Sequence, residues 1–197
     1  MKTNAAAQKT NVLLRIGTVL LVLAVLVTAV VEGSVYLTAR RLASVTEALE
    51  ARLPARTLGM FGERSDPSMP IVRLDSTDYL ALIEFPSHNA CFPVAAEWDS
   101  RKAMRCPARF SGSAYDGILI IGASELRGQI DFVRKLDIGE YITVTDMRGR
   151  QYRYEIRTIK PVQTLDPDLP AERDMDLMLF TSSPLSSGYH VILCKRI

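Results

Sequence analysis

An uncharged apolar run near the N-terminus constrains this chain more than any other feature. Ile16 to Val31 reads IGTVLLVLAVLVTAVV, and the apolar residues just before it extend the segment toward the roughly 20 residues that cross a bilayer as a helix. The run is apolar on every face, so the core helix of a soluble protein does not explain it. We therefore expect a transmembrane signal-anchor helix over residues 12–34. A cleaved signal peptide ending near Val27-Thr28-Ala29 is the alternative.

Basic residues on both sides of the run bear on its orientation. Lys2 and Lys9 precede it and Arg40 and Arg41 follow it, so the positive-inside rule favours a cytoplasmic N-terminus (residues 1–11) by a small margin only. With either an anchor or a signal peptide, the rest of the chain is exported. We expect a single-pass protein of the cell membrane with an extracellular C-terminal domain.

The next segment combines helical spacing with turn residues. Pro54 ends a stretch without glycine or proline, and Pro, Gly and Ser residues then continue to Pro70. Residues 35–70 are thus predicted to be a helical stalk with a solvated face, followed by a linker, and residues 71–197 a separate domain. Four apolar residues of the stalk recur at helical spacing: Val35, Leu42, Val45 and Leu49.

Short β-like runs fill the C-terminal domain. Met147–Arg150 separates two of them and holds a glycine, as a hairpin loop does. Gln129–Leu136 is predicted to form a short helix. Many strands with little helix favour a mainly β domain, a closed or nearly closed barrel. The predicted strands are Leu80–Phe85, Ile118–Gly122, Tyr141–Asp146, Gln151–Ile159, Leu177–Thr181 and Val191–Lys195.

Charge and cysteine content exclude several classes of function. With 24 Lys and Arg against 22 Asp and Glu, the chain lacks the concentrated basic field of a nucleic-acid-binding protein, so we expect no such partner. The chain has only two histidines and three cysteines, and no two cysteines form a C-x-x-C pair, which argues against a Cys/His zinc site. We expect no metal and no cofactor. For Cys106 and Cys194, a disulfide and two separate buried thiols both stay open.

Segments of the C-terminal domain resemble motifs of the sortases, the surface transpeptidases of Gram-positive bacteria. Leu82–Val94 resembles the family's entry strand. Ile118–Ser124 (ILIIGAS) is similar to the strand that normally ends I-A-G-H, and Leu177–Ser182 (LMLFTS) to L-T-L-F-T-C. Leu136–Val144 and Val191–Arg196 are similar to two further strands, and the order is that of the family, nearest to its class B-like members. The resemblance implies a sortase-like closed β-barrel with short helices.

The resemblance also implies three catalytic side chains, and the aligned positions hold none of them. A sortase uses a cysteine thiolate that attacks a Thr–Gly-type bond of a sorting signal, a histidine acid and an arginine that stabilises the oxyanion. Aligned without gaps, the cysteine position falls on Ser182, the histidine position on Ser124 and the arginine position on Tyr189. A serine hydroxyl needs a base before it attacks. The sequence predicts a pseudoenzyme.

Three hypotheses follow. In the first, a membrane-anchored pseudo-sortase binds or scaffolds a partner in a groove lined by Phe180 and Thr181; the partner is a sorting-signal peptide, a cell-wall or pilus protein, or an active sortase. In the second, Ser182 is the unorthodox nucleophile of an active hydrolase or transpeptidase, and a one-residue shift makes His190 its base. In the third, Tyr189 packs into a collapsed groove and the protein is purely structural.

Overall fold

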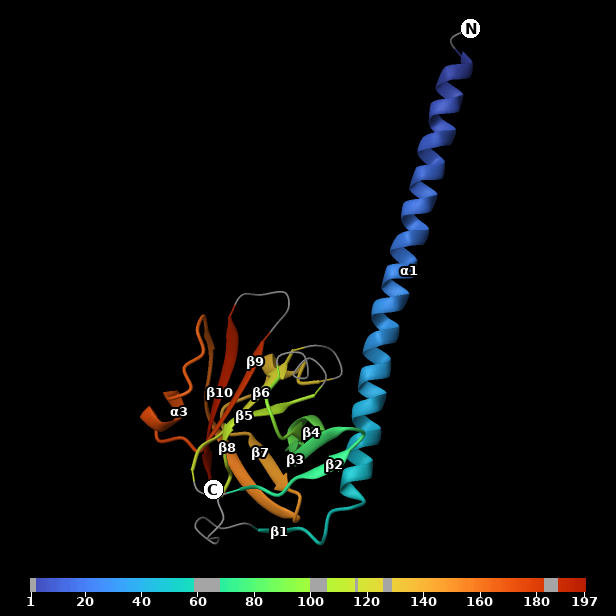
Figure 1. Cartoon of the computed structure of the whole chain (residues 1–197). Coiled ribbons are helices and arrows are strands. Elements are labelled where there is room, and N and C mark those ends of the chain that lie inside the picture. Colours follow the sequence, from blue (N-terminus) through green and yellow to red (C-terminus); the bar gives the residue numbers. More distant parts are fainter. Residues whose placement is uncertain (1–2, 59–67, 100–105, 116, 126–128, 183–187) are drawn as a thin grey trace. The chain divides into compact units, whose positions relative to one another are not determined.

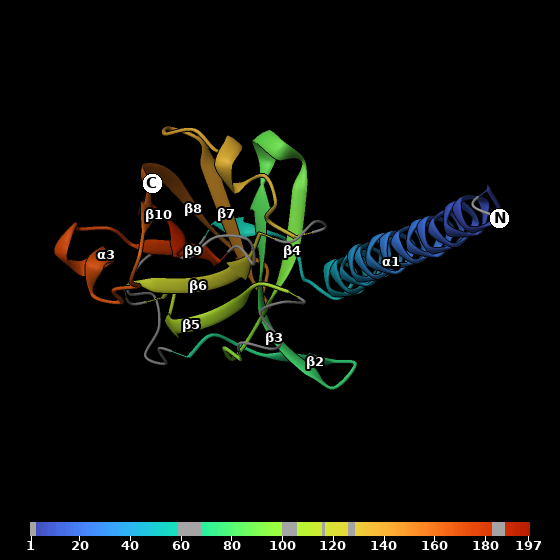
Figure 2. The ribbon, with the colours of Figure 1, turned by 90° about the horizontal axis from the view of Figure 1, so that it is seen from above.

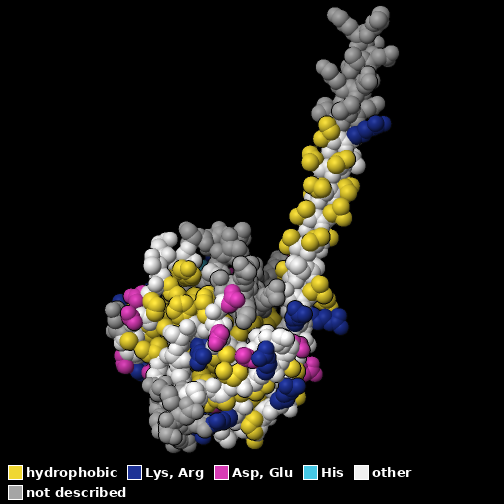
Figure 3. Space-filling model, viewed as in Figure 1, with side chains coloured by type: hydrophobic (Ala, Val, Ile, Leu, Met, Phe, Trp, Pro, Cys, Tyr) yellow, Lys and Arg dark blue, Asp and Glu magenta, His cyan; other side chains and the backbone are white. Residues whose placement is uncertain are grey.

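A computed structural model describes residues 3–58, 68–99, 106–115, 117–125, 129–182 and 188–197. Helix α1 spans Thr3–Glu50, and the chain divides into two compact units, Met1–Leu37 and Thr38–Ile197, with the boundary inside this helix (Figure 1). From Arg15 onward α1 contains a stretch long and apolar enough to cross a membrane, with a mean hydropathy of 2.4. Its apolar side chains are exposed, as the yellow atoms along the helix in Figure 3 show. This helix indicates membrane association.

The last three turns of α1 belong to the second unit and pack on its strands. Leu42, Val45 and Leu49 are 7%, 6% and 1% exposed, so the apolar residues predicted to line a stalk are part of a core. The spacing identified the helix correctly, but the predicted stalk does not stand apart from the domain over these turns. We call this group, together with the barrel residues beneath it, the helix-seat cluster; its barrel residues are Tyr79, Leu82, Ala95, Cys106, Ala108 and Met147.

The described strands of the second unit form a closed barrel (Figure 2). The order around the wall is β8-β10-β9-β6-β5-β4-β3, and β7 closes it by pairing with both β3 and β8. The β6–β9 and β4–β5 pairs are parallel and the other pairs of the wall are antiparallel. The strands are β3 Thr77–Phe85, β4 Ala90–Ala95, β5 Ala108–Gly112, β6 Leu119–Ser124, β7 Tyr141–Asp146, β8 Arg150–Val162, β9 Leu177–Ser182 and β10 Tyr189–Arg196.

The two faces of the wall bury different side chains. Along β8, Tyr152 and Tyr154 are buried whereas Arg153 is exposed, which confirms the alternation expected of a half-buried strand. β6 and β9 were predicted to be central, and they lie side by side with apolar residues covering both faces. Their inward residues, such as Ile121 and Leu179, join the main core, and their outward residues form a second apolar cluster.

The predicted hairpin at Met147–Arg150 is confirmed. The Asp146 carboxylate accepts hydrogen bonds from the backbone N–H groups of Arg148 (2.8 Å) and Arg150 (2.9 Å). Gly149 has φ +77°, and a Cβ there would lie 2.7 Å from the Pro54 carbonyl oxygen. The turn therefore needs glycine both for its backbone angle and for this approach.

Several local predictions are wrong or incomplete. The expected Gln129–Leu136 helix is only a 3-10 turn, η2 (Val133–Lys135); Val133 in the turn and Ile130 and Leu136 on either side of it are buried. Their spacing of three suits a 3-10 turn better than an α-helix. The strand predictions omitted β4, β5 and two short additions to the barrel, β1 (Thr57–Leu58) on β8 and β2 (Val72–Leu74) on β3. Two further short elements are η1 (Pro86–His88) and α3 (Leu169–Glu172).

The two buried cysteines lie in different apolar clusters. Cys194 is fully buried in the main core, whereas Cys106 belongs to the helix-seat cluster. No disulfide joins them. Of the two alternatives left open by the sequence, the structure shows separate buried thiols.

Candidate functional site

Three strands place the aligned serine, serine and tyrosine in one row. Ser124 ends β6 and pairs in register with Ser182, which ends β9; Ser182 pairs in turn with Tyr189, which begins β10. Neighbouring strands lie about 4.8 Å apart, and residues in register point to the same face of a sheet. The structure thus brings together the three positions that the alignment proposed. We call them the serine–tyrosine row.

The row lies on the outer face of the barrel. Two residues before Ser182 on the same face is Phe180, which is 1% exposed and belongs to the outward apolar cluster. Ser124 is 5% exposed, whereas Ser182 and Tyr189 are half-buried. Thr181, the other predicted groove residue, is fully buried and points inward, so it does not line this face.

Aromatic rings occupy the space next to the row. The Phe180 ring centroid lies 5.2 Å from that of Trp98, 5.5 Å from that of Phe110 and 5.9 Å from that of Tyr189. Tyr189 meets Phe180 edge to face, with an interplanar angle of 84°. The position predicted to correspond to the sortase arginine therefore holds a phenol ring that packs on Phe180.

The proposed base, His190, is on the opposite face from Ser182. His190 pairs in register with Thr181, and its Nδ1 lies 2.5 Å from Glu125 Oε1. The Thr181 hydroxyl donates to the same oxygen at 2.9 Å. The register shift of β10 against β8 lies between Leu193 and Cys194, away from this level of the strand. The shift that would turn His190 toward Ser182 is absent from the described strand.

The sequence analysis did not identify Glu125. Its side chain is 8% exposed, and Arg134 Nη2 lies 3.3 Å from its second oxygen. Burial by itself raises the pKa of Glu125, but hydrogen bonds from His190 and Thr181 and the charges of His190 and Arg134 outweigh burial and lower it. The sequence did contain a signal for Glu125. It follows Ser124 directly, and the alternation of side chains along a strand places it on the same face as His190.

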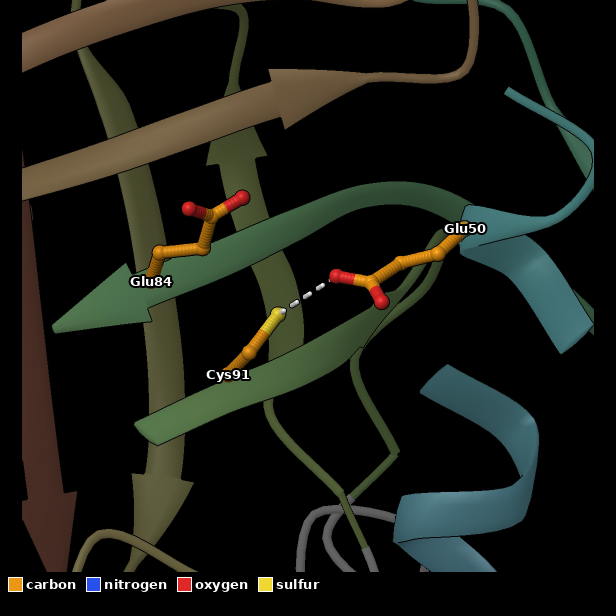
Figure 4. A group of neighbouring side chains, drawn as sticks. All are labelled: Glu50, Glu84 and Cys91. Atoms are coloured by element: carbon orange, nitrogen blue, oxygen red, sulfur yellow. Dashed lines mark hydrogen bonds between the residues drawn. The ribbon is translucent and has the colours of Figure 1, made fainter. Parts of the chain in front are cut away.

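Cys91 and Cys194 offer no substitute thiolate. Cys91 Sγ lies 3.9 Å from Glu50 Oε1 and near Glu84 (Figure 4). Burial, with these two carboxylates, raises the pKa of Cys91 to about 12, the opposite of nucleophile activation. Burial also raises the pKa of Cys194. The potential ligand atoms of Glu50, Glu84 and Cys91 lie within 4.8 Å of one another, but Arg56 already pairs with both carboxylates at 3.3 and 3.0 Å.

Solved structures resemble this chain, although no family model and no curated protein sequence matches it. Sortase A from Corynebacterium diphtheriae aligns over 85% of each chain, with a TM-score of 0.54 and 18% identity. The chain has the sortase fold. Sortase C-1 from Actinomyces oris covers 81% of this chain and 98% of its own, with a TM-score of 0.52 and 16% identity. Sortase C from Clostridium perfringens SM101 covers 61% and 70%, with a TM-score of 0.50 and 20% identity.

The sortase fold does not by itself decide the chemistry, because function depends on the side chains of a site and not on the barrel that carries them. The sortases named above are of types A and C, so the class B-like resemblance of the motifs stays a prediction. The assignment of Ser182, Ser124 and Tyr189 to the family's cysteine, histidine and arginine positions also stays a prediction; their common row is consistent with it.

Proposed function

We propose that this protein is a membrane-anchored member of the sortase family that lacks transpeptidase activity and binds or scaffolds a surface partner. The partner classes are a sorting-signal peptide, a cell-wall or pilus protein, and an active sortase. The observation that supports the proposal is the serine–tyrosine row. At the three positions that the alignment assigns to the thiol, the imidazole and the guanidinium, the chain has hydroxyl and phenol groups.

The energetic argument against turnover rests on three separate losses. Without an adjacent base, the Ser182 hydroxyl has negligible oxyanion character at neutral pH. The loss of an acid–base group alone costs about 10²–10⁴-fold in rate, and the missing oxyanion donor adds to this without simple additivity. The nearest candidate base, His190, is held by Glu125 on the other face. Binding needs none of these groups, since an extended segment is held by shape and hydrogen bonds.

The orientation of the anchor completes the proposal. The apolar part of α1 supports anchoring, and Lys2 and Lys9 before it favour a cytoplasmic N-terminus. The barrel domain is then outside the cell, where the proposed partners are found.

A peptide assay on the full chain in lipid nanodiscs tests this function. A fluorogenic sorting-signal peptide should bind without measurable cleavage, and Ser182→Ala should change neither result. Ser111→Ala, an exposed serine of β5, is the matched control. Turnover by the wild-type chain that Ser182→Ala abolishes and Ser111→Ala preserves would establish the unorthodox enzyme instead.

A purely structural role is the second candidate, because Tyr189 packs on Phe180 as a collapsed groove requires. It predicts that the wild-type chain binds no peptide of the sorting-signal class. It also predicts that Tyr189→Ala leaves this result unchanged, because nothing on the face was adapted to a ligand. Peptide binding by the wild-type chain would exclude this candidate.

A further inference from the structure

Trp98, the only tryptophan of the chain, lies directly on the backbone of β6. A Cβ built at Gly122 would lie 2.1 Å from Trp98 Cζ3 and 2.5 Å from Phe180 Cζ. Side-chain atoms do not approach this closely, so the indole can rest here only because residue 122 is glycine. Its ring centroid lies 5.9 Å from that of Phe110, which completes the aromatic group.

Gly122 places this contact beside the serine–tyrosine row. Gly122 pairs in register with Phe180, and Ser124, two residues further along β6, pairs with Ser182. Residues two apart on a strand share a face, so the indole takes the space next to the row. A segment that extends along this face of β6 past Gly122 must displace Trp98.

Trp98 has a second set of neighbours at the end of α1. It packs against the helix-seat cluster as well as the outward apolar cluster, and it is the only aromatic residue of the described chain that packs against both. The helix contributes Leu42, Val45 and Leu49 to that cluster. The indole is therefore supported on one side by β6 and β9 and on the other by the packing that seats the helix.

The backbone just before Trp98 is fixed. The Ala95 N–H donates to the Pro107 carbonyl at 2.8 Å, and the Ala96 N–H donates to the Asp78 carbonyl at 2.7 Å. Arg109 Nε donates to the Ala96 carbonyl at 2.9 Å. Because these bonds hold the chain two residues away, movement of the indole does not require β4 to move.

We propose that Trp98 is an internal cover for this face and that it couples the face to the membrane-proximal helix: the indole covers Gly122 when the end of α1 is seated and leaves when it is not. The inference rests on the proposed binding function, because the Trp98 cover controls access to the face where the partner binds. Coupling of this kind is reciprocal, so a change that expels the indole from Gly122 must also weaken the seating of the helix.

Tryptophan fluorescence of the full chain in detergent micelles tests one direction, since the single indole of the chain then supplies the whole signal. Val45→Asp places a charge in the helix-seat cluster, and Ala43→Asp places the same charge on the exposed side of the helix. We expect Val45→Asp to shift the emission to longer wavelength and to increase quenching by iodide, and Ala43→Asp to do neither. If Val45→Asp gives faster amide exchange in residues 42–53 but leaves the tryptophan emission unchanged, the proposal is wrong.

Gly122→Ala tests the other direction and does not disturb the helix directly. Its Cβ should displace the indole, with the same emission shift, and should give several-fold faster amide exchange in residues 42–53. Gly117→Ala is the control, because a Cβ at Gly117 meets nothing within 4 Å. An emission shift without faster exchange overturns the coupling.

If Val45→Asp loses its near-ultraviolet circular dichroism, it is unfolded and tests nothing. The comparison of Gly122→Ala with Gly117→Ala then still tests the coupling between the indole and the helix. Neither measurement needs a ligand. Failure of peptide binding with both responses intact therefore overturns the proposed function and leaves the cover in place.

Discussion

The two faces of β6, β9 and β10 carry opposite chemistry at the same level of the barrel. The outer face has the serine–tyrosine row and aromatic rings, whereas the inner face has the imidazole of His190 and the carboxylate of Glu125. Each inner residue is one position along its strand from a member of the row. Because side chains alternate, one residue of displacement is enough to keep a hydroxyl and its potential base on different sides of a sheet.

The largest effect is expected from the aromatic packing of the outer face. Phe180→Ala removes a side chain that is 1% exposed and touches three other rings, so it should lower the free energy of unfolding by about 3–5 kcal/mol. Urea unfolding followed by Trp98 fluorescence measures this. Phe110→Ala, at a side chain 37% exposed, should cost clearly less. Equal losses for the two variants would show that the outer face is not packed around Phe180.

The inner face should respond next. Glu125→Gln removes the charge that His190, Thr181 and Arg134 share, and hydrogen bonds to charged groups contribute about 1.5–3 kcal/mol each. We expect a loss of this order in the free energy of unfolding. Glu155→Gln, which breaks the ion pair between Glu155 and Arg157 on the barrel surface, is the control and should cost less than about 1 kcal/mol.

The same carboxylate predicts a pH dependence. The pKa of Glu125 is lowered in the folded state, so the unfolded chain binds the proton more tightly. The stability that Glu125 contributes is therefore complete above its unfolded pKa of about 4.3 and is lost as the pH falls through the folded value. The difference in unfolding free energy between wild type and Glu125→Gln should shrink on acidification below that point. A difference that stays constant with pH would contradict the assignment.

The smallest effect is expected from a substitution that tests whether Ser182 and His190 lie on different faces. Ser182→Cys installs a thiol with nearly the same shape, and with His190 on the other face its pKa should stay near the ordinary value of about 8.5. The pH dependence of alkylation measures it, and Cys91 contributes little because its own pKa is about 12. Ser182→Cys combined with His190→Ala should give the same profile. If the introduced thiol has a pKa well below neutral pH and the additional His190→Ala change raises it again, His190 must lie against residue 182.

Much of the fold was predictable because it depends on local patterns. The hairpin at Met147–Arg150 and the extent of β7 followed from alternation and turn chemistry, and strands β6 and β9 from nearly continuous apolar runs. Ser124 and Ser182, the two positions that gapless counting selected, pair in register in the structure. The short strands β4 and β5 were missed as strands, since segments of five or six residues with mixed exposure give weak periodicity.

By itself, the sequence determined that the chain has an apolar helix able to cross a membrane, a β-barrel, and no thiol, imidazole or guanidinium at the aligned positions. Only the tertiary structure decided that Leu42, Val45 and Leu49 seat the helix on the barrel, that Trp98 rests on Gly122 and that Glu125 holds His190. The physical reason is sequence distance. Periodicity and turn chemistry act over a few residues, whereas the Trp98–Gly122 and Glu125–His190 contacts join residues 24 and 65 positions apart, whose approach depends on how the whole barrel closes.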